Sequence, residues 1–280
     1  YVTNNHFCQI YMYNLFVFLY EFPYNKICGE NMKLLASDFD NTLWFEDHMK
    51  DEDVKAIHEF QKHGHLFGIC SGRSLSGILR PSKPYDIQYD FFILLSGGLI
   101  LNKDYEPIFE SQIPISLVKD IYEFTGKQNM SIVHNDVTYH LNTKFQDHIF
   151  DHEIHSFNEL PFTHIQAFSF HYQDHELDLA QKMTHLIIDK YGHQIEAFQN
   201  NQHIDLAMKG CSKGKGIQII EKYFHLSHDH VYGIGDNYND LPMLDAIQHS
   251  YSFDYAPLPV QKHAKTIVSQ LSKCILDIEK

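Results

Sequence analysis

The sequence contains few cysteines, few basic residues and no hydrophobic run long enough to cross a membrane. Its five cysteines are an odd number without a Cys-x-x-Cys pair, which excludes a disulfide framework. Scattered free cysteines are typical of proteins in a reducing compartment. We therefore predict a cytoplasmic location.

Basic residues are outnumbered by acidic ones: 22 Lys and Arg stand against 36 Asp and Glu, a formal net charge of −14. A general nucleic-acid binder needs a basic face to meet phosphates, so we expect no nucleic-acid partner. A site for an anionic small molecule must then be made locally positive by a metal ion, a lysine or helix N-termini.

Residues 1–31 differ in character from the rest of the chain. The aromatic stretch Phe7–Phe22 is too short for a membrane span and is interrupted by Gln9 and Asn14. It also lacks the basic region of a signal peptide, so we expect no membrane partner. Met32 leads directly into the first core strand, and we predict that residues 1–31 are an upstream translated or appended extension. A natively expressed protein whose mass includes this extension would contradict that prediction.

Two acidic motifs follow apolar runs that are far apart in the chain. Asp38 and Asp40 come directly after a predicted strand at Lys33–Ser37, and Asp236 and Asp240 come after a second strand. Parallel strands bring such ends to one edge of a sheet, where carboxylates repel each other unless a cation lies between them. The motifs predict a Mg²⁺ site that uses the Asp38 and Asp236 carboxylates and the Asp40 main-chain carbonyl, with Asp240 holding bound waters.

The same acidic pair offers the groups that phosphoryl transfer requires. Asp38 can attack phosphorus to form an aspartyl-phosphate, which divides a difficult step into two. Asp40 is placed to protonate the leaving oxygen and then to deprotonate the attacking water. Together they predict a nucleophile and an acid/base in one crevice.

Three further residues precede predicted helices. Ser71 and Gly72 lie where a hydroxyl and free N–H groups suit a phosphate. Lys213 can neutralise the nucleophile and a phosphate oxygen together, although Lys215 is an equal candidate on charge alone. Each motif alone also fits a turn or a surface residue. Found in order, each at a strand end or helix start, they indicate phosphoryl transfer.

The ordered motifs Asp-x-Asp-x-Thr, Ser-Gly-Arg, Lys-Gly and Gly-Asp-x-x-Asn-Asp extend from Met32 to the C-terminal region. This order resembles the haloacid dehalogenase-like superfamily of phosphohydrolases, and its Cof-type branch in particular. Asn41 departs from the usual Gly, but Asn tolerates positive φ, so we expect the turn to form. The resemblance implies Asp38 as nucleophile, Asp40 as acid/base, Lys213 as phosphate stabiliser, Ser71, Gly72, Thr42 and Asn239 as phosphate or substrate contacts, and Asp236 as metal ligand.

Strand and helix patterns alternate from Met32 onward. They predict an α/β fold, with a Rossmann-like parallel sheet core and an inserted α+β cap domain, an open sheet with helices on one face. We assign residues 32–103 and 203–280 to the core and 104–202 to the cap, with two short crossings suited to hinge closure. The interval from Asp38 to Ser71 is too short for a cap, so the insertion must lie later.

The expected elements follow from hydrophobic periodicity and turn signals. In the core we expect strands at Lys33–Ser37, His65–Cys70, Phe91–Leu95, Leu99–Asn102, His203–Met208, His230–Ile234 and Ser250–Phe253, and helices at Asp51–His63, Ser74–Leu79, Gly214–Phe224, Asp240–Ile247, Pro259–Ala264 and Ser269–Glu279. In the cap we expect helices at Pro114–Gln128, Phe145–Phe157 and Asp174–Tyr191, and strands at Ser131–His134, Val137–Leu141, His164–His171 and Gln194–Gln199.

These features predict a Mg²⁺-dependent phosphatase that hydrolyses small phosphorylated metabolites through an aspartyl-phosphate, and the resemblance favours sugar phosphates. Asp40 argues against carbon–halogen cleavage, which has no leaving oxygen to protonate. One alternative is a phosphotransferase or phosphomutase that passes the phosphoryl group to a second sugar. Another is a non-catalytic phosphometabolite-binding protein, which would not need Asp38, Asp40, Lys213 and Asp236 intact.

Substrate choice should depend on cap residues, and two stretches are candidates. They are the hairpin region at Ser131–Thr138 and the stretch at Phe162–Phe170. We expect a monomer or a homodimer.

Overall fold

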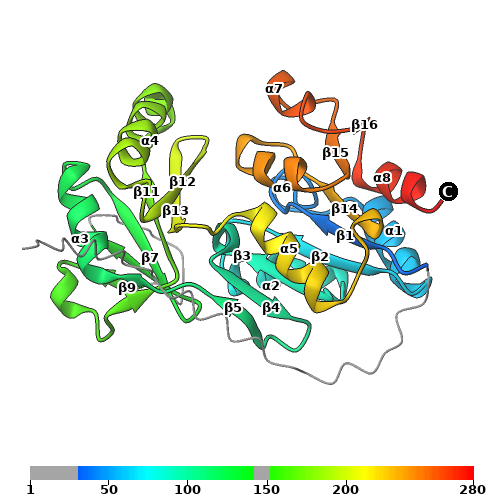
Figure 1. Ribbon diagram of the computed structural model, residues 1–280, viewed down its shortest axis with the longest axis horizontal. Helices are drawn as coiled ribbons and strands as arrows, with labels where there is room; N and C mark the ends of the chain where they lie inside the picture. The colour runs from blue at the N-terminus through cyan, green and yellow to red at the C-terminus, as the bar shows by residue number, and fades with distance from the viewer. Residues whose placement is uncertain (1–30, 142–151) are drawn as a thin grey trace, which may run out of the picture.

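The computed structural model describes residues 31–141 and 152–280 and shows two lobes, each with its own sheet and hydrophobic cluster (Figure 1). We call the larger lobe the core and the smaller one the cap. Residues 1–30 of the predicted extension lie outside the described residues, as does most of the helix predicted at Phe145–Phe157. Within the described ranges, no helix has both the length and the apolar character needed to cross a lipid bilayer.

The core is built on an eight-stranded sheet in the order β16-β15-β14-β1-β2-β3-β4-β5. The strands from β16 to β3 pair in parallel, and β4 and β5 are antiparallel additions at one edge. Residues of β1 and β3 are buried throughout, because helices cover both faces of a parallel sheet of this kind. The strands are β1 (Leu34–Ser37), β2 (Leu66–Cys70), β3 (Phe91–Leu94), β4 (Leu99–Asn102), β5 (Pro107–Glu110), β14 (Val231–Ile234), β15 (His249–Phe253) and β16 (Thr266–Val268).

The core helices pack in pairs, α1 with α8 and α5 with α6. Helix α1 buries Val54, Ile57 and Phe60 at helical spacing, and Gly64 ends it with φ of +88° as a C-terminal cap requires. The helices are α1 (Asp51–Lys62), α2 (Leu75–Ser82), α5 (Lys213–Tyr223), α6 (Leu241–Ala246), α7 (Leu258–Gln261) and α8 (Leu271–Ile278).

The cap is built on a six-stranded sheet in the order β12-β13-β11-β7-β8-β9, antiparallel except for β8 and β9. Helices α3 and α4 contribute to the same hydrophobic cluster as alternate residues of its central strands. A separate two-stranded sheet pairs β6 (Ile113–Pro114) with β10 (His164–Ile165). The other cap elements are α3 (Ile115–Phe124), α4 (Leu177–Tyr191), β7 (Met130–His134), β8 (Val137–Leu141), β9 (His152–Ile154), β11 (Ala167–His171), β12 (Ile195–Asn200) and β13 (His203–Met208).

Sheet membership differs from the predicted boundaries at both crossings. The strand predicted at His203–Met208 forms as β13, but it pairs with β11 and β12 in the cap sheet rather than joining the core. At the other crossing, β5 lies within the range predicted as cap, yet it pairs with β4 in the core sheet. By sheet membership, the cap therefore begins after Glu110 and ends after Met208.

One predicted cap helix is wrong where the structure describes it. Residues His152–Ile154, at the end of the helix predicted for Phe145–Phe157, form strand β9. They pair in parallel with Tyr139–Leu141 of β8, and Ile154 is buried in the cap cluster. Sheet pairing and burial here override the local helical pattern.

Candidate active site

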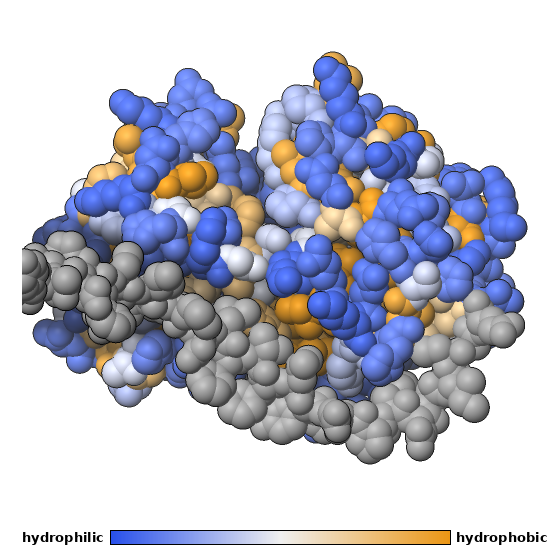
Figure 2. Space-filling model, viewed as in Figure 1, coloured by the Kyte–Doolittle hydropathy of each residue, from blue (hydrophilic) through white to orange (hydrophobic). Residues whose placement is uncertain are grey.

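A cleft of about 400 Å³ lies between the two lobes, and both contribute to its lining. Figure 2 shows the surface hollowed between the lobes, with hydrophilic residues on both flanks. The core side contains most of the predicted site residues: Asp38, Asp40, Ser71, Gly72, Asp236 and Asn239.

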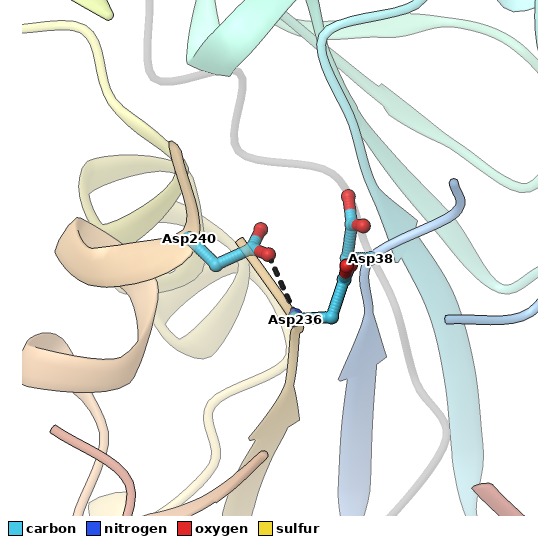
Figure 3. Close-up of side chains that lie close together, drawn as sticks. All are labelled: Asp38, Asp236 and Asp240. Carbon is cyan, nitrogen blue, oxygen red and sulfur yellow. Dashed lines mark hydrogen bonds between the residues drawn. The ribbon is translucent and has the colours of Figure 1, made fainter. Parts of the chain in front are cut away.

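Asp38 and Asp236 extend from the ends of the neighbouring strands β1 and β14 (Figure 3). The backbone N–H of Asp38 donates to the Ile234 carbonyl at 2.9 Å, which fixes the two strand ends side by side. Carboxylate oxygens of Asp38, Asp236 and Asp240 all lie within 4.8 Å of one another. The parallel sheet therefore brings together acidic residues that are far apart in the sequence.

Asp240 fixes the turn that follows β14. Its Oδ2 accepts hydrogen bonds from the backbone N–H groups of Asp236 and Asn237, both at 2.9 Å. Its Oδ1 accepts from Lys213 Nζ at 2.5 Å. Because both oxygens already have partners, Asp240 is placed to support the other carboxylates from behind.

Lys213 is 1% exposed and lies between two carboxylates. Its ammonium donates to Asp38 Oδ1 at 2.6 Å as well as to Asp240. Lys215 is exposed and contacts Gln218 instead. Of the two lysines that charge alone left equal, the structure brings only Lys213 into the site.

The electrostatics of this cluster favour an additional cation. Burial raises the pKa of Asp38, the charge of Asp240 raises it further, and Lys213 opposes both. Burial and Asp240 raise the pKa of Asp236 to about 7. For Lys213, burial lowers the pKa, but the charges of Asp240 and Asp38 outweigh burial and leave it raised. An all-oxygen donor set carrying more negative charge than one lysine balances fits Mg²⁺.

Ser71 and Asn239 present polar groups to the cleft. The Ser71 hydroxyl is buried and accepts a hydrogen bond from the Arg73 N–H at 3.2 Å. The Asn239 side-chain oxygen is buried without a hydrogen-bond partner, which an incoming ligand would satisfy. Thr42 differs from the expected phosphate contact. It is fully buried outside the cleft lining, and its hydroxyl donates to Asp236 Oδ1 at 3.2 Å.

Asp40 lies in the cleft, paired with Arg73. Arg73 donates two hydrogen bonds to its carboxylate, at 2.9 Å from Nε and 2.6 Å from Nη2. A third hydrogen bond from Arg73, to the Gly77 carbonyl at 3.0 Å, fixes the guanidinium. Arg73 is thus an ion-pair partner of the predicted acid/base.

The turn after the first motif forms with Asn41 in place of glycine. Asn41 has φ of +58°, and its N–H donates to the Trp44 carbonyl at 2.8 Å. This confirms the expectation that asparagine supports the left-handed backbone here.

The cap side of the cleft was not anticipated from the sequence. It consists of the β12–β13 turn at residues 200–202 together with His203 and Asp205. Among the described residues, neither predicted stretch, Ser131–Thr138 or Phe162–Phe170, contributes to the lining. The polar–apolar alternation of β13 was the available signal, because it marks a strand with one face open to a polar region.

A parallel sheet with acidic strand ends beneath a cap defines a class of two-lobed α/β enzymes. The family profile of haloacid dehalogenase-like hydrolases matches residues 35–273. The chain therefore belongs to this family of hydrolases.

Individual proteins agree with this assignment. The chain is 24% identical over 243 residues to a protein of Haemophilus influenzae named as a phosphatase, a match that covers 85% of this chain and 92% of that protein. It superposes on an HAD/COF-like hydrolase of Plasmodium vivax with a TM-score of 0.78 at 20% identity, covering 89% of this chain and 95% of the other. A subclass IIB sugar phosphatase gives a TM-score of 0.73 at 18% identity, covering 89% and 99%.

Proposed function

We propose that this enzyme is a Mg²⁺-dependent phosphatase of small phosphorylated metabolites, with sugar phosphates as the leading substrate class. The observation that carries the proposal is the position of Asp38, buried at the floor of the cleft beside Lys213 and Asp236, with Asp40 in the same cleft. The similarity to a named phosphatase and the shared fold with a sugar phosphatase support it.

In the first step of the proposed reaction, an Asp38 carboxylate oxygen attacks phosphorus and the bond to the leaving oxygen breaks. Asp40 supplies the proton to that oxygen. In the second step Asp40 removes a proton from water, which attacks phosphorus and releases Asp38 and inorganic phosphate. Asp40 is held by Arg73 here, so its carboxylate must pivot away from at least one of these hydrogen bonds to act.

The remaining core residues hold the phosphoryl group and the cation. Ser71 and Gly72 are placed to donate hydrogen bonds to phosphate oxygens, and Lys213 to neutralise charge. Asn239 is placed to contact the substrate through its unpartnered side-chain oxygen, which accepts from a donor group. Asp38, Asp236 and the Asp40 carbonyl would hold Mg²⁺, supported by Asp240. When bound, this ion offsets the negative charge of the phosphoryl oxygens.

Hydrolysis of p-nitrophenyl phosphate tests the proposal. We expect activity with Mg²⁺, none with EDTA, and a loss of at least about 1,000-fold in Asp38→Asn. Asp189→Asn, on the exposed side of α4, is the matched control and should keep full activity. An Asp38→Asn protein as active as wild type would exclude Asp38 as the nucleophile, and an inactive wild type would contradict the phosphatase proposal.

We also place the enzyme in the cytoplasm. Cys70, Cys211 and Cys274 are free and buried, which suits a reducing compartment.

A further inference from the structure

The cap sheet presents a row of polar side chains on the face opposite its hydrophobic cluster. Along β11 and β13, Ser169 pairs with Asp205 and His171 pairs with His203. The residues between them on each strand are buried in the cap cluster, as strand periodicity requires. We call Ser169, His171, His203 and Asp205 the polar sheet face.

Hydrogen bonds fix the polar sheet face. The Ser169 hydroxyl donates to Asp205 Oδ1 at 2.8 Å, and His171 Nδ1 lies 3.0 Å from His203 Nδ1. Asn200, in the adjacent strand, approaches Asp205 Oδ2 at 3.5 Å. Among the described residues, Asp205 Oδ2 thus has only this long hydrogen bond, and Asp205 lines the cleft.

Asp205 reaches across the cleft to the core. A Cβ added at Gly72 would lie 3.1 Å from Asp205 Oδ2, so this oxygen is nearly in contact with the loop that carries Ser71. Both Asp205 and Gly72 line the cleft. A cap carboxylate therefore stands over the proposed phosphate-binding loop, where the rest of a bound substrate must pass.

The cap side of the cleft contains no lysine or arginine that would balance a second anion, among the residues that the structure describes. Its described lining residues are His203, Asp205 and the side-chain amides at residues 200–202. On the core side, Arg73 is engaged by Asp40. An additional phosphate or carboxylate on the leaving group would therefore meet Asp205 rather than a cation.

We infer that Asp205 is a specificity-determining residue, which selects phosphate monoesters whose leaving group carries hydroxyl or amino donors and no second anionic group. This inference rests on the proposed phosphatase function. The Asp205 carboxylate accepts hydrogen bonds from such donors, with the neighbouring amides completing the set. A second anion next to it suffers like-charge repulsion and the loss of its own hydration.

Burial raises the pKa of Asp205, so matched substrate pairs test this at mildly alkaline pH, which favours the carboxylate. We compare glycerol 3-phosphate with 3-phosphoglycerate, and fructose 6-phosphate with fructose 1,6-bisphosphate. In each pair we expect kcat/KM to be at least about tenfold higher for the member without the second anion. Equal or faster hydrolysis of the more anionic members would overturn the inference, as would no turnover of any member by an enzyme that cleaves p-nitrophenyl phosphate.

Substitution then assigns the preference to one residue. Asp205→Asn keeps the shape of the side chain and removes its charge. The kcat/KM ratio between the two members of each substrate pair should therefore fall at least about fivefold, mainly through KM. Asp205→Ser serves as a second variant, and Asp189→Asn is the control that should keep the wild-type preference. An unchanged preference in a folded Asp205 variant would overturn the assignment. Failure of wild type to hydrolyse p-nitrophenyl phosphate would instead contradict the phosphatase proposal.

Discussion

The two sheets of this enzyme present polar groups in different ways. The parallel core sheet is covered on both faces, so its polar groups gather at the strand ends, where β1 and β14 place Asp38 and Asp236. The antiparallel cap sheet is buried on one face only, so its polar groups lie along the strands, as Ser169 and Asp205 do. A sheet covered on both faces thus offers polar groups only at its strand ends, whereas a sheet with one open face offers them along its strands.

The largest change in activity should come from substituting Asp40, the proposed acid/base of the core. Asp40→Asn removes the proton donor, so hydrolysis of an alkyl phosphate should fall by about 1,000-fold. The loss should be smaller for p-nitrophenyl phosphate, because its leaving group needs little protonation. Steady-state rates with both esters measure the difference. Equal losses would mean that Asp40 acts by another route.

The next largest effect, on the free energy of unfolding, should come from removing the buried charge of Lys213. Lys213→Met leaves Asp38 and Asp240 without their shared cation, so we expect a loss of about 3–5 kcal/mol in unfolding free energy at neutral pH. Burial already raises the pKa of Asp38, and protonation would relieve the unpaired charge. The loss should therefore shrink as pH falls. Urea unfolding at several pH values measures it, with Lys215→Met as the matched exposed control.

Metal removal should expose the repulsion among the core carboxylates. Burial and Asp240 raise the pKa of Asp236 from 3.8 to about 7. In EDTA, the free energy of unfolding should therefore fall as pH rises through that range, because the folded state holds the Asp236 proton more tightly than the unfolded state does. Mg²⁺ should raise the melting temperature of wild type by several degrees. Asp236→Asn should melt at least as high as wild type in EDTA above neutral pH, and gain little from Mg²⁺. A full Mg²⁺ response in Asp236→Asn would remove this residue from the metal site.

The smallest effect, on the pH dependence of stability, should come from His171 in the cap sheet. Burial, together with the nearby His203 and His140, lowers the pKa of His171 from 6.5 to about 3, and Ser131 contacts its ring. Its folded pKa is depressed, so protonation favours unfolding and stability is lost as pH falls from about 6.5 towards 3. From pH 7 to pH 5, the free energy of unfolding should fall by about 1–2 kcal/mol less in His171→Gln than in wild type. Urea unfolding at both pH values measures this difference. Parallel losses would contradict a neutral buried imidazole.

The placement of the candidate core residues was predictable because the acidic residues and the strands that carry them appear in the same short motifs. An apolar run followed by Asp38, and another followed by Asp236, specify two strand ends. Parallel pairing then leaves little freedom in where those ends meet. The family membership shown by the profile match follows from the same residues.

The cap side was not predictable in the same way. Asp205 becomes part of the cleft only because β13 pairs with β11 and β12, and local sequence does not name a strand's neighbours. The alternation of His203 and Asp205 with the buried apolar Ile204 and Leu206 does distinguish β13 from the continuously apolar core strands. Thr42 shows a second limit: the motif indicates a residue near the site, but only packing shows that it contacts Asp236 rather than the cleft.

Trapping the covalent intermediate on Asp38 tests the proposed mechanism at its first step. Wild-type enzyme mixed rapidly with substrate and Mg²⁺ is quenched in acid and reduced with borohydride, which converts an aspartyl-phosphate to homoserine. Peptide mass spectrometry should find homoserine at position 38 in wild type and none there in Asp38→Asn. Homoserine at another aspartate, or substrate turnover with no reducible acyl phosphate, would contradict the central role of Asp38.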